Sequence, residues 1–301
     1  MSLHKTDFLG DRVHLEIYID KPAPLADGTE VVEEKQVESV RIAQSFLWPH
    51  GDKLVIVRQE HYGLKEQWLN IWFPASNDEI AMIIEDDNAV SPVFYKFLKQ
   101  TLQRYFSSTS EPGTFDPRIF GIMLQNQHFI PGRYPTPPSE LLSPSVSYYR
   151  FQQLSTWGPV FFPSHWASFI AWTNARSEDQ SFRPLFSNMK TNEWYLTRNG
   201  GQSVWSAYFM RFAAERGLYA IYTNFHDNAG LVVNYRDKGV NFNEDKGVNS
   251  PMLESLDRIA KLPPSPFDMP LYDFHFNLIE DDPSILELRG LYSDTFNVFT
   301  H

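Results

Sequence analysis

The sequence contains no cysteine, and this absence removes several kinds of chemistry. Without cysteine there is no disulfide framework, no thiolate nucleophile and no zinc site built on thiolates. Long apolar runs are missing too, since no segment approaches the roughly 20 apolar residues that span a membrane. The first residues also lack an apolar stretch of signal-peptide length. As written, the chain is therefore expected to be soluble and to carry no membrane span.

Basic residues are too few to balance the acids. The chain has 26 Lys and Arg against 37 Asp and Glu, which gives a formal charge of -11. Because binding to a phosphate backbone needs a basic surface, we expect no nucleic-acid partner. Sequence motifs of serine hydrolases, P-loop kinases, dinucleotide-dependent dehydrogenases and zinc proteases are absent as well. What is present is a globular composition, with 42% hydrophobic residues, 24 Phe, 14 Tyr and 8 Trp.

The most informative pattern is an apolar run that ends on three acids. Residues 80–84 are all apolar, and Glu85, Asp86 and Asp87 follow directly. A short apolar run predicts a buried strand of a parallel sheet, and ligands of open α/β sheets bind beyond the carboxyl ends of such strands. Successive side chains diverge, so that one carboxylate can serve a divalent cation with phosphate oxygens and the other a hydroxyl. The alternative is a solvated acidic loop without a function.

Hydrophobic periodicity predicts an α/β fold. Residues 13–19 and 53–58 read as strands around a helix across 30–48, which together make a βαβ unit. Such units place their strands parallel to one another. We therefore expect one domain over residues 1–301, with a mostly parallel sheet flanked by helices.

Helix and loop signals fill in the remainder. Ser91 is expected to cap a helix after the acidic strand, and Gly217 to end a later helix. The segment 131–147 is dense in Pro and Ser and predicts a surface loop, which serves as a lid or merely as a connection. Residues 188–202 predict a second, polar loop.

The acidic stretch resembles the Glu-Asp-Asp metal motif of nucleotide-sugar transferases of the GT-A fold. The likeness is greatest to the N-acetylglucosaminyltransferases that start complex N-glycans, and to family 2-like relatives. It extends over roughly residues 13–249, because other segments match in the same order: Gly63-Leu64-Lys65-Glu66-Gln67-Trp68, Trp157-Gly158-Pro159 and Ser203-Val204-Trp205. The resemblance implies a Rossmann-like GT-A fold. It also implies transfer of a sugar from a UDP- or GDP-sugar donor to a glycan or another hydroxyl acceptor.

The resemblance gives the acids their roles. It assigns a manganese or magnesium ion to Asp87, places Asp86 near the donor ribose and leaves Glu85 in support. The reaction breaks a sugar–phosphate bond, and a divalent ion stabilises the charge on the departing nucleotide diphosphate.

Two further residues are candidates for binding the donor. Gly63 follows a predicted strand, where backbone can approach a nucleotide, although a lone glycine there is also an ordinary turn. Arg236 lies beside Lys238 and a glycine, an arrangement that suits a diphosphate but equally a solvated turn. For the acceptor, Trp157 beside Gly158 suits stacking on a sugar, and the alternative is packing.

The catalytic base is less clear from the sequence. The related N-glycan enzymes carry acids where this chain has Ser206 and Ala207, and neither of these residues can accept the proton of the acceptor hydroxyl. Glu193 and Asp227 are the candidates that remain. For each of them the alternative is an ordinary surface carboxylate.

The start of the chain differs from the family pattern. Ten residues precede Asp11, whereas the family's first strand lies upstream of a segment like residues 11–20. We therefore expect an N-terminally incomplete domain that lacks this strand and the family's membrane anchor. The rival hypothesis is a catalytically inactive module that binds a sugar or a partner. Residence in the Golgi is implied by the resemblance alone.

Overall fold

The computed structural model describes residues 2–24, 34–107, 114–177, 179, 181–186, 189–197, 204–238, 243–257, 259–280 and 283–286. The chain forms two compact units. The larger unit comprises Met1–Asp7, Pro74–Trp194 and Ser206–His301. The smaller unit comprises Phe8–Phe73 and Tyr195–Trp205.

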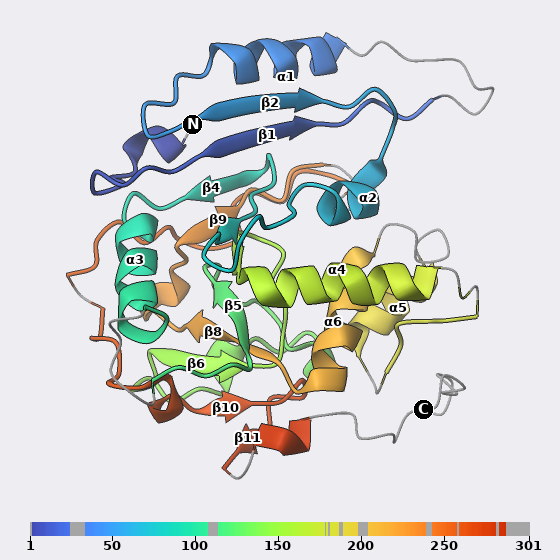
Figure 1. The fold of residues 1–301 in the computed structure, drawn as a ribbon. Coiled ribbons are helices and arrows are strands. Elements are labelled where there is room, and N and C mark those ends of the chain that lie inside the picture. Colours follow the sequence, from blue (N-terminus) through green and yellow to red (C-terminus); the bar gives the residue numbers. More distant parts are fainter. Residues whose placement is uncertain are drawn as a thin grey trace. The chain divides into compact units, whose positions relative to one another are not determined.

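The smaller unit contains the predicted βαβ arrangement. Strands β1 (Leu15–Ile19) and β2 (Lys53–Val57) pair in parallel along their whole length, and α1 (Glu34–Ser45) connects them (Figure 1). The chain then enters α2 (Gly63–Leu69). The βαβ prediction is confirmed, but β1 and β2 form a two-stranded sheet of their own.

The larger unit is built on a seven-stranded mixed sheet in the order β11-β10-β6-β8-β5-β7-β3. Its strands are β3 (Ala81–Met82), β5 (Ile119–Met123), β6 (Tyr148–Phe151), β7 (Pro159–Phe161), β8 (Tyr219–Thr223), β10 (Leu271–Tyr272) and β11 (Leu278–Ile279). Only the pairs β10–β6 and β5–β8 are parallel, and the other four neighbouring pairs are antiparallel.

The prediction of a mostly parallel, Rossmann-like sheet is therefore wrong. An apolar run reports burial on both faces of a strand, and it carries no information about the direction of the neighbouring strand. All five residues of β5 and of β8 are buried. These strands are buried because helices cover each face of the sheet, and not because βαβ crossovers repeat along it.

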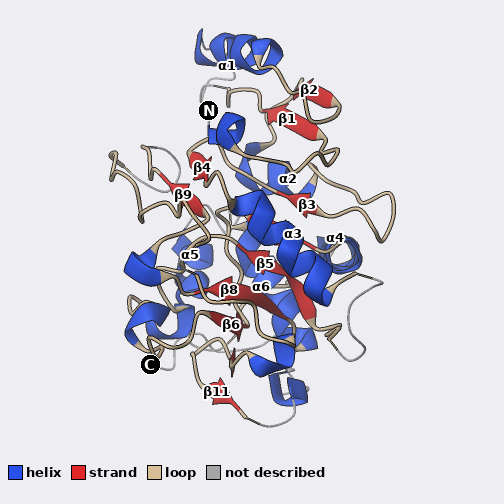
Figure 2. Ribbon diagram, turned by 90° about the vertical axis from the view of Figure 1, so that its left-hand side faces the viewer, coloured by secondary structure: helices blue, strands red, loops and turns tan. Residues whose placement is uncertain are grey.

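Helices cover both faces of this sheet. In Figures 1 and 2, α3 lies on one side of the strands, and α4 and α6 lie on the other. The bounds of these helices are Phe94–Tyr105 for α3, Pro163–Ser177 for α4 and Trp205–Arg216 for α6. A further helix, α5 (Lys190–Thr197), lies between α4 and α6 along the chain. Aromatic rings join α4 to α6: the Phe169 ring lies 4.8 Å from that of Phe209 and 5.5 Å from that of Phe212. These rings are fully buried and form the core of the larger unit.

Short elements complete the fold. Strands β4 (Asn88–Val90) and β9 (Val232–Asn234) form a separate antiparallel ribbon. The 3₁₀ turns are η1 (Ser2–Lys5), η2 (Pro131–Arg133), η3 (Pro138–Glu140), η5 (His226–Asn228), η6 (Pro266–Asp268) and η7 (Pro283–Leu286). No helix in the described ranges is long and apolar enough to cross a membrane.

Several local predictions need correction. The apolar run 80–84 yields only the short β3, which pairs antiparallel with β7 at the edge of the sheet. Residues 188–202 are not a loop throughout, because α5 lies within them. Ser91 does not cap α3, since Val93 occupies the N-cap position. The helix end at Gly217 is confirmed, with φ of 60°.

The segment 131–147 is packed more closely than a free surface loop. It contains η2 and η3, and it buries Pro131, Pro138 and Leu142. Its remaining residues are exposed or half-buried. The segment is therefore an anchored connection with an exposed rim.

Candidate functional site

The acidic residues lie where two distant parts of the chain meet. Glu85, Asp86 and Asp87 connect β3 to β4, and β4 pairs antiparallel with β9, with Asn88 opposite Asn234. The backbone N–H of Tyr235 donates to the carbonyl of Asp87 at 2.8 Å. This ribbon therefore holds Asp87 beside the end of β9.

The Asp87 carboxylate is held by two amides. Its Oδ1 accepts hydrogen bonds from Nδ2 of Asn234 at 2.7 Å and from Nδ2 of Asn88 at 3.0 Å. Burial raises the pKa of Asp87, and the nearby charges of Asp86 and Asp237 raise it further, whereas the bond from Asn234 acts in the opposite direction. The ionised form is thus disfavoured, and a cation at this position would relieve that cost.

Asn234 extends the network away from the acid. Its backbone N–H donates to Oδ1 of Asn249 at 2.8 Å, and the backbone N–H of Asn249 donates to the Asn234 carbonyl at 2.9 Å. The Nδ2 of Asn249 in turn lies 2.8 Å from Nε2 of His128. Asp87, Asn234, Asn249 and His128 therefore form one connected group, which we call the Asp87 cluster.

The protonation of His128 follows from this network. An amide Nδ2 can only donate, so Nε2 of His128 accepts and the ring proton lies on Nδ1. Burial lowers the pKa of His128, and the positive charge of Arg236 lowers it further. The ring is therefore neutral at pH 7, as the hydrogen bond requires.

The predicted acceptor residues lie next to this cluster. The Trp157 ring centroid is 6.1 Å from that of His128. Gly158 adopts φ of 69°, and a Cβ added there would lie 2.5 Å from Cγ2 of Val232 on β9. The Trp157–Gly158 turn is thus pressed against the ribbon that carries Asp87, and glycine is required there.

Arg236 follows β9, and its side chain donates to the backbone of residues 246–248. Its Nε donates to the carbonyl of Gly247, and its Nη2 donates to those of Lys246 and Val248, at 2.8–3.0 Å. Its backbone N–H donates to Oδ1 of Asn234 at 2.6 Å. The side chain thus holds the segment before Asn249 in place. Its positive charge acts on His128, a member of the cluster.

A divalent ion is compatible with these donors. In the described part of the chain no group of three or more His, Cys, Asp or Glu side chains is arranged to hold a metal ion. Magnesium-type ions at phosphate sites, however, need only one or two carboxylates, because the substrate phosphates and water supply the other ligands. Asp87 offers one half-buried carboxylate, and the exposed Asp86 is its neighbour. These residues fit an ion that binds together with a diphosphate.

Gly63 belongs to the smaller unit. Its N–H and that of Tyr62 donate to the two carboxylate oxygens of Asp20, each at 2.8 Å. Gly63 has φ of 68°, which explains the glycine at the first position of α2. Its amide is occupied by an acid that the sequence interpretation did not single out.

The two candidate bases lie outside the Asp87 cluster. Glu193 is exposed on α5 and forms an ion pair with Lys190. Asp227 is exposed in η5, with φ of 58°. Among the described residues, the hydrogen bonds of the cluster include neither of them. Of the matched segment at the start of α6, Ala207 is buried and Ser206 half-buried, whereas Ser203 lies outside the described residues.

Three members of the cluster escaped the sequence interpretation: His128, Asn234 and Asn249. Each is a common residue type in no motif. Asn234 is 147 residues from Asp87 along the chain, and Asn249 is 121 residues from His128. The sequence signal for Asn234 was indirect, because it lies two residues before the candidate Arg236. The antiparallel pairing of β4 with β9 brings Asn234 to Asp87, and the hydrogen bonds of Asn249 join His128 to them.

Comparison with known proteins gives a family but no activity. No curated protein matches the chain. A family described as SPBC1E8.03c C-terminal domain matches residues 29–182, a range that includes Asp87 and Trp157 but ends before Asn234. Since the match covers just over half of the sequence, the chain belongs to the SPBC1E8.03c C-terminal domain family.

Proposed function

We propose that this protein is a metal-dependent glycosyltransferase that moves a sugar from a nucleotide-sugar donor to a glycan or another hydroxyl acceptor. The proposal rests on the ordered likeness to nucleotide-sugar transferases and on one structural observation. Asp87, the residue assigned to the metal, shares a hydrogen-bonded cluster with His128, which lies beside Trp157, the residue assigned to the acceptor.

The chemistry of the cluster suits a diphosphate with a divalent ion. Asp87 would hold Mn²⁺ or Mg²⁺, with Asp86 beside it, and the ion would neutralise charge on the departing nucleotide diphosphate. Asn234 and Asn88 orient the Asp87 carboxylate by donating to its Oδ1, and an amide N–H does not protonate it. The fixed carboxylate lowers the reorganisation needed when the charged donor arrives.

Calorimetric titration tests this function directly. UDP- and GDP-sugars are titrated into the full chain with and without Mn²⁺, and we expect binding that requires the ion. Asp87→Asn should abolish the Mn²⁺-dependent part, because an amide is a weak ligand for a hard cation. Asp257→Asn, a change at an exposed carboxylate outside the cluster, is the matched control.

The second candidate is a catalytically inactive module that binds a sugar or a partner. The observation in its favour is the position of the two candidate bases, Glu193 and Asp227, outside the Asp87 cluster, together with Ser206 and Ala207 in the matched segment. Turnover separates the two functions. Mn²⁺-dependent donor binding without release of nucleotide, with water or with any hydroxyl acceptor, would identify the binding module.

By the same likeness we place the protein in the Golgi. Fluorescence microscopy of the tagged protein, with a Golgi marker in the same cells, tests this location. A diffuse signal through the cytosol would contradict it.

A further inference from the structure

Two arginines with the same local arrangement lie near the carboxyl ends of α4 and α6. Arg176 Cζ is 4.0 Å from the ring centroid of Trp172, four residues earlier in α4, and its Nη1 donates to the Trp172 carbonyl at 3.4 Å. Arg216 Cζ is 4.3 Å from the ring centroid of Phe212, four residues earlier in α6, and its Nη1 donates to the Phe212 carbonyl at 3.5 Å. Each guanidinium is therefore oriented by its own helix before any ligand binds.

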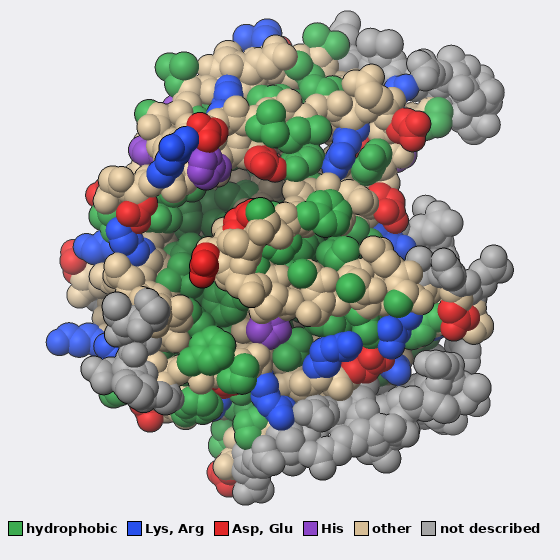
Figure 3. Space-filling view, in the orientation of Figure 1, with side chains coloured by type: hydrophobic (Ala, Val, Ile, Leu, Met, Phe, Trp, Pro, Cys, Tyr) green, Lys and Arg blue, Asp and Glu red, His purple; other side chains and the backbone are tan. Residues whose placement is uncertain are grey.

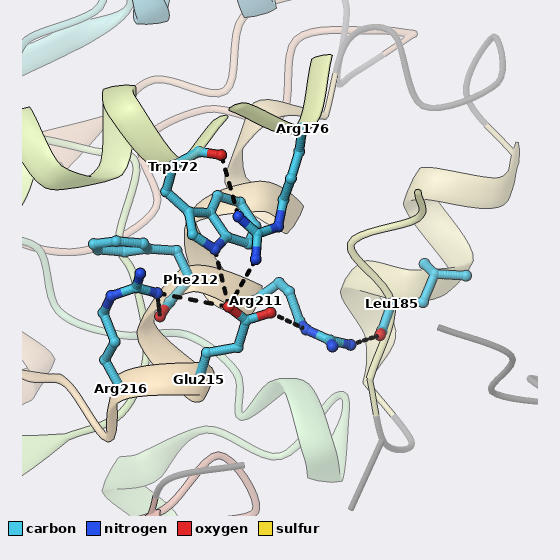
Figure 4. Close-up of polar contacts among 7 residues, drawn as sticks. All are labelled: Trp172, Arg176, Leu185, Arg211, Phe212, Glu215 and Arg216. Atoms are coloured by element: carbon cyan, nitrogen blue, oxygen red, sulfur yellow. Dashed lines mark hydrogen bonds and ion pairs between the residues drawn. The ribbon is translucent and has the colours of Figure 1, made fainter. Parts of the chain in front are cut away.

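A single carboxylate lies at the centre of this group. Oε2 of Glu215 accepts from Nε1 of Trp172 at 2.9 Å, and it is 3.4 Å from Nη2 of Arg176 and 3.6 Å from Nη1 of Arg216 (Figure 4). Oε1 accepts from Nε of Arg211 at 2.9 Å. Because Arg176 and Arg216 approach the same oxygen, the two guanidinium groups lie close together.

Among the described residues, Arg176 and Arg216 share one carboxylate oxygen, Oε2 of Glu215. Arg211 lies on the other oxygen of Glu215 and is buried, with 6% of its side chain exposed. Arg176 and Arg216 reach solvent, with 31% and 41% of their side chains exposed. Burial lowers the pKa of Arg216, the charge of Glu215 acts in the opposite direction, and the charge of Arg176 lowers the pKa further, so Arg176 repels the charged form of Arg216. A bound anion would remove this repulsion.

Hydrogen-bond donors remain for such an anion. A guanidinium has five N–H groups, and Arg216 uses only Nη1 with the described residues. In the same described ranges, Arg176 uses Nη1 and Nη2 but not Nε. On the face seen in Figure 3, Lys and Arg side chains gather around acidic ones below α4.

We propose that Arg176 and Arg216 together bind a phosphate group at the solvent side of this cluster. A tetrahedral oxyanion presents acceptor oxygens in several directions, so it can bridge two guanidinium groups that belong to different helices. A carboxylate has two oxygens in one plane, and Glu215 already provides that group at the centre. The phosphate is either the free inorganic ion or a monoester on a small molecule. None of these residues belongs to the Asp87 cluster, so the site is independent of the proposed glycosyltransferase activity.

Calorimetry of the full chain tests the site. Inorganic phosphate, glycerol phosphate and acetate are titrated at equal ionic strength in EDTA, which removes divalent ions and with them any contribution from Asp87. We expect saturable binding of phosphate and none of acetate. Arg216→Gln should weaken phosphate binding by about tenfold or more, since it removes charged hydrogen bonds. Arg133→Gln, which removes an exposed arginine bonded to Asn277, should leave it unchanged.

A second variant separates binding from a purely structural role. Glu215→Gln removes the central negative charge, so it should lower the melting temperature in chloride and tighten the binding of phosphate. A cluster that only holds α4 to α6 would lose stability without gaining affinity. Tighter binding of glycerol phosphate than of inorganic phosphate identifies a monoester as the ligand, and the reverse order identifies the free ion. Absence of saturable binding, equal binding of acetate, or an unchanged affinity in Arg216→Gln would overturn the proposal.

Discussion

Asn234 connects the Asp87 carboxylate to the remainder of its cluster. Replacing its amide nitrogen by an oxygen therefore tests how much this connection contributes to stability. In Asn234→Asp, the donor to Asp87 Oδ1 becomes a second carboxylate in a buried position. We expect the free energy of unfolding to fall by about 1–3 kcal/mol at pH 7. The difference should shrink as the pH falls towards about 4, because burial and the second charge raise the pKa of the pair above its unfolded value, so that one acid takes up a proton. Urea denaturation measures both values, and the exposed Asn243→Asp should change neither by more than a few tenths.

His128 gives the cluster a dependence on pH. Its pKa is lowered in the folded protein, so unfolding takes up a proton, and stability falls as the pH drops below about 6.5. Gln at this position keeps an acceptor for the Asn249 amide but does not titrate. In His128→Gln, the loss of stability between pH 6.5 and 5.5 should therefore be smaller by up to about 1 kcal/mol.

Denaturation at each pH, with the exposed His226→Gln as control, decides the question. Parallel curves for the wild type and His128→Gln would mean that this histidine does not carry the pH dependence.

At the scale of elements, the contact between the Trp157–Gly158 turn and β9 can be tested by adding one methyl group. Gly158→Ala combines φ of 69° with a Cβ placed 2.5 Å from the Val232 side chain. We expect a loss of about 2–4 kcal/mol, from backbone strain and overpacking together. Gly247→Ala is a matched control, because φ is 71° there but the space around the Cβ is open, so only the strain of about 1–2 kcal/mol applies.

Val232→Ala makes room for the added methyl group. The double variant Gly158→Ala, Val232→Ala should therefore lose less stability than the two single changes together. Strict additivity would show that the turn has moved away from β9 instead of pressing on it.

At the scale of the whole molecule, the charge of -11 governs encounters with polyanions. The Arg176 and Arg216 pair offers too few contacts to hold a phosphate backbone, and the other surface charges repel it. We expect no mobility shift of duplex DNA at about 50 mM salt, even at micromolar protein. A shift that disappears in Arg216→Gln would instead assign the arginine pair to nucleic acid.

Local patterns in the sequence predicted the individual elements well. The βαβ unit, the helix that ends at Gly217 and the acids after a short strand are all present. Each depends on residues that are neighbours along the chain, where periodicity and helix-end preferences act directly. The wrong predictions have two causes. An apolar run does not indicate the direction of the neighbouring strands in the seven-stranded sheet, and α5 lacks a strong apolar stripe that would predict a helix.

The sequence by itself determined which residues carry charge, which segments are apolar, and that three acids follow a strand before Asn88. Only the tertiary structure decided what these acids touch. The β4–β9 pairing brings Asn234 to Asp87, and the ends of α4 and α6 gather Arg176 and Arg216 around Glu215. The physical reason is that hydrogen bonds and charge interactions act within a few ångströms in space. Their distance along the chain has no bearing on them, and no local pattern records it.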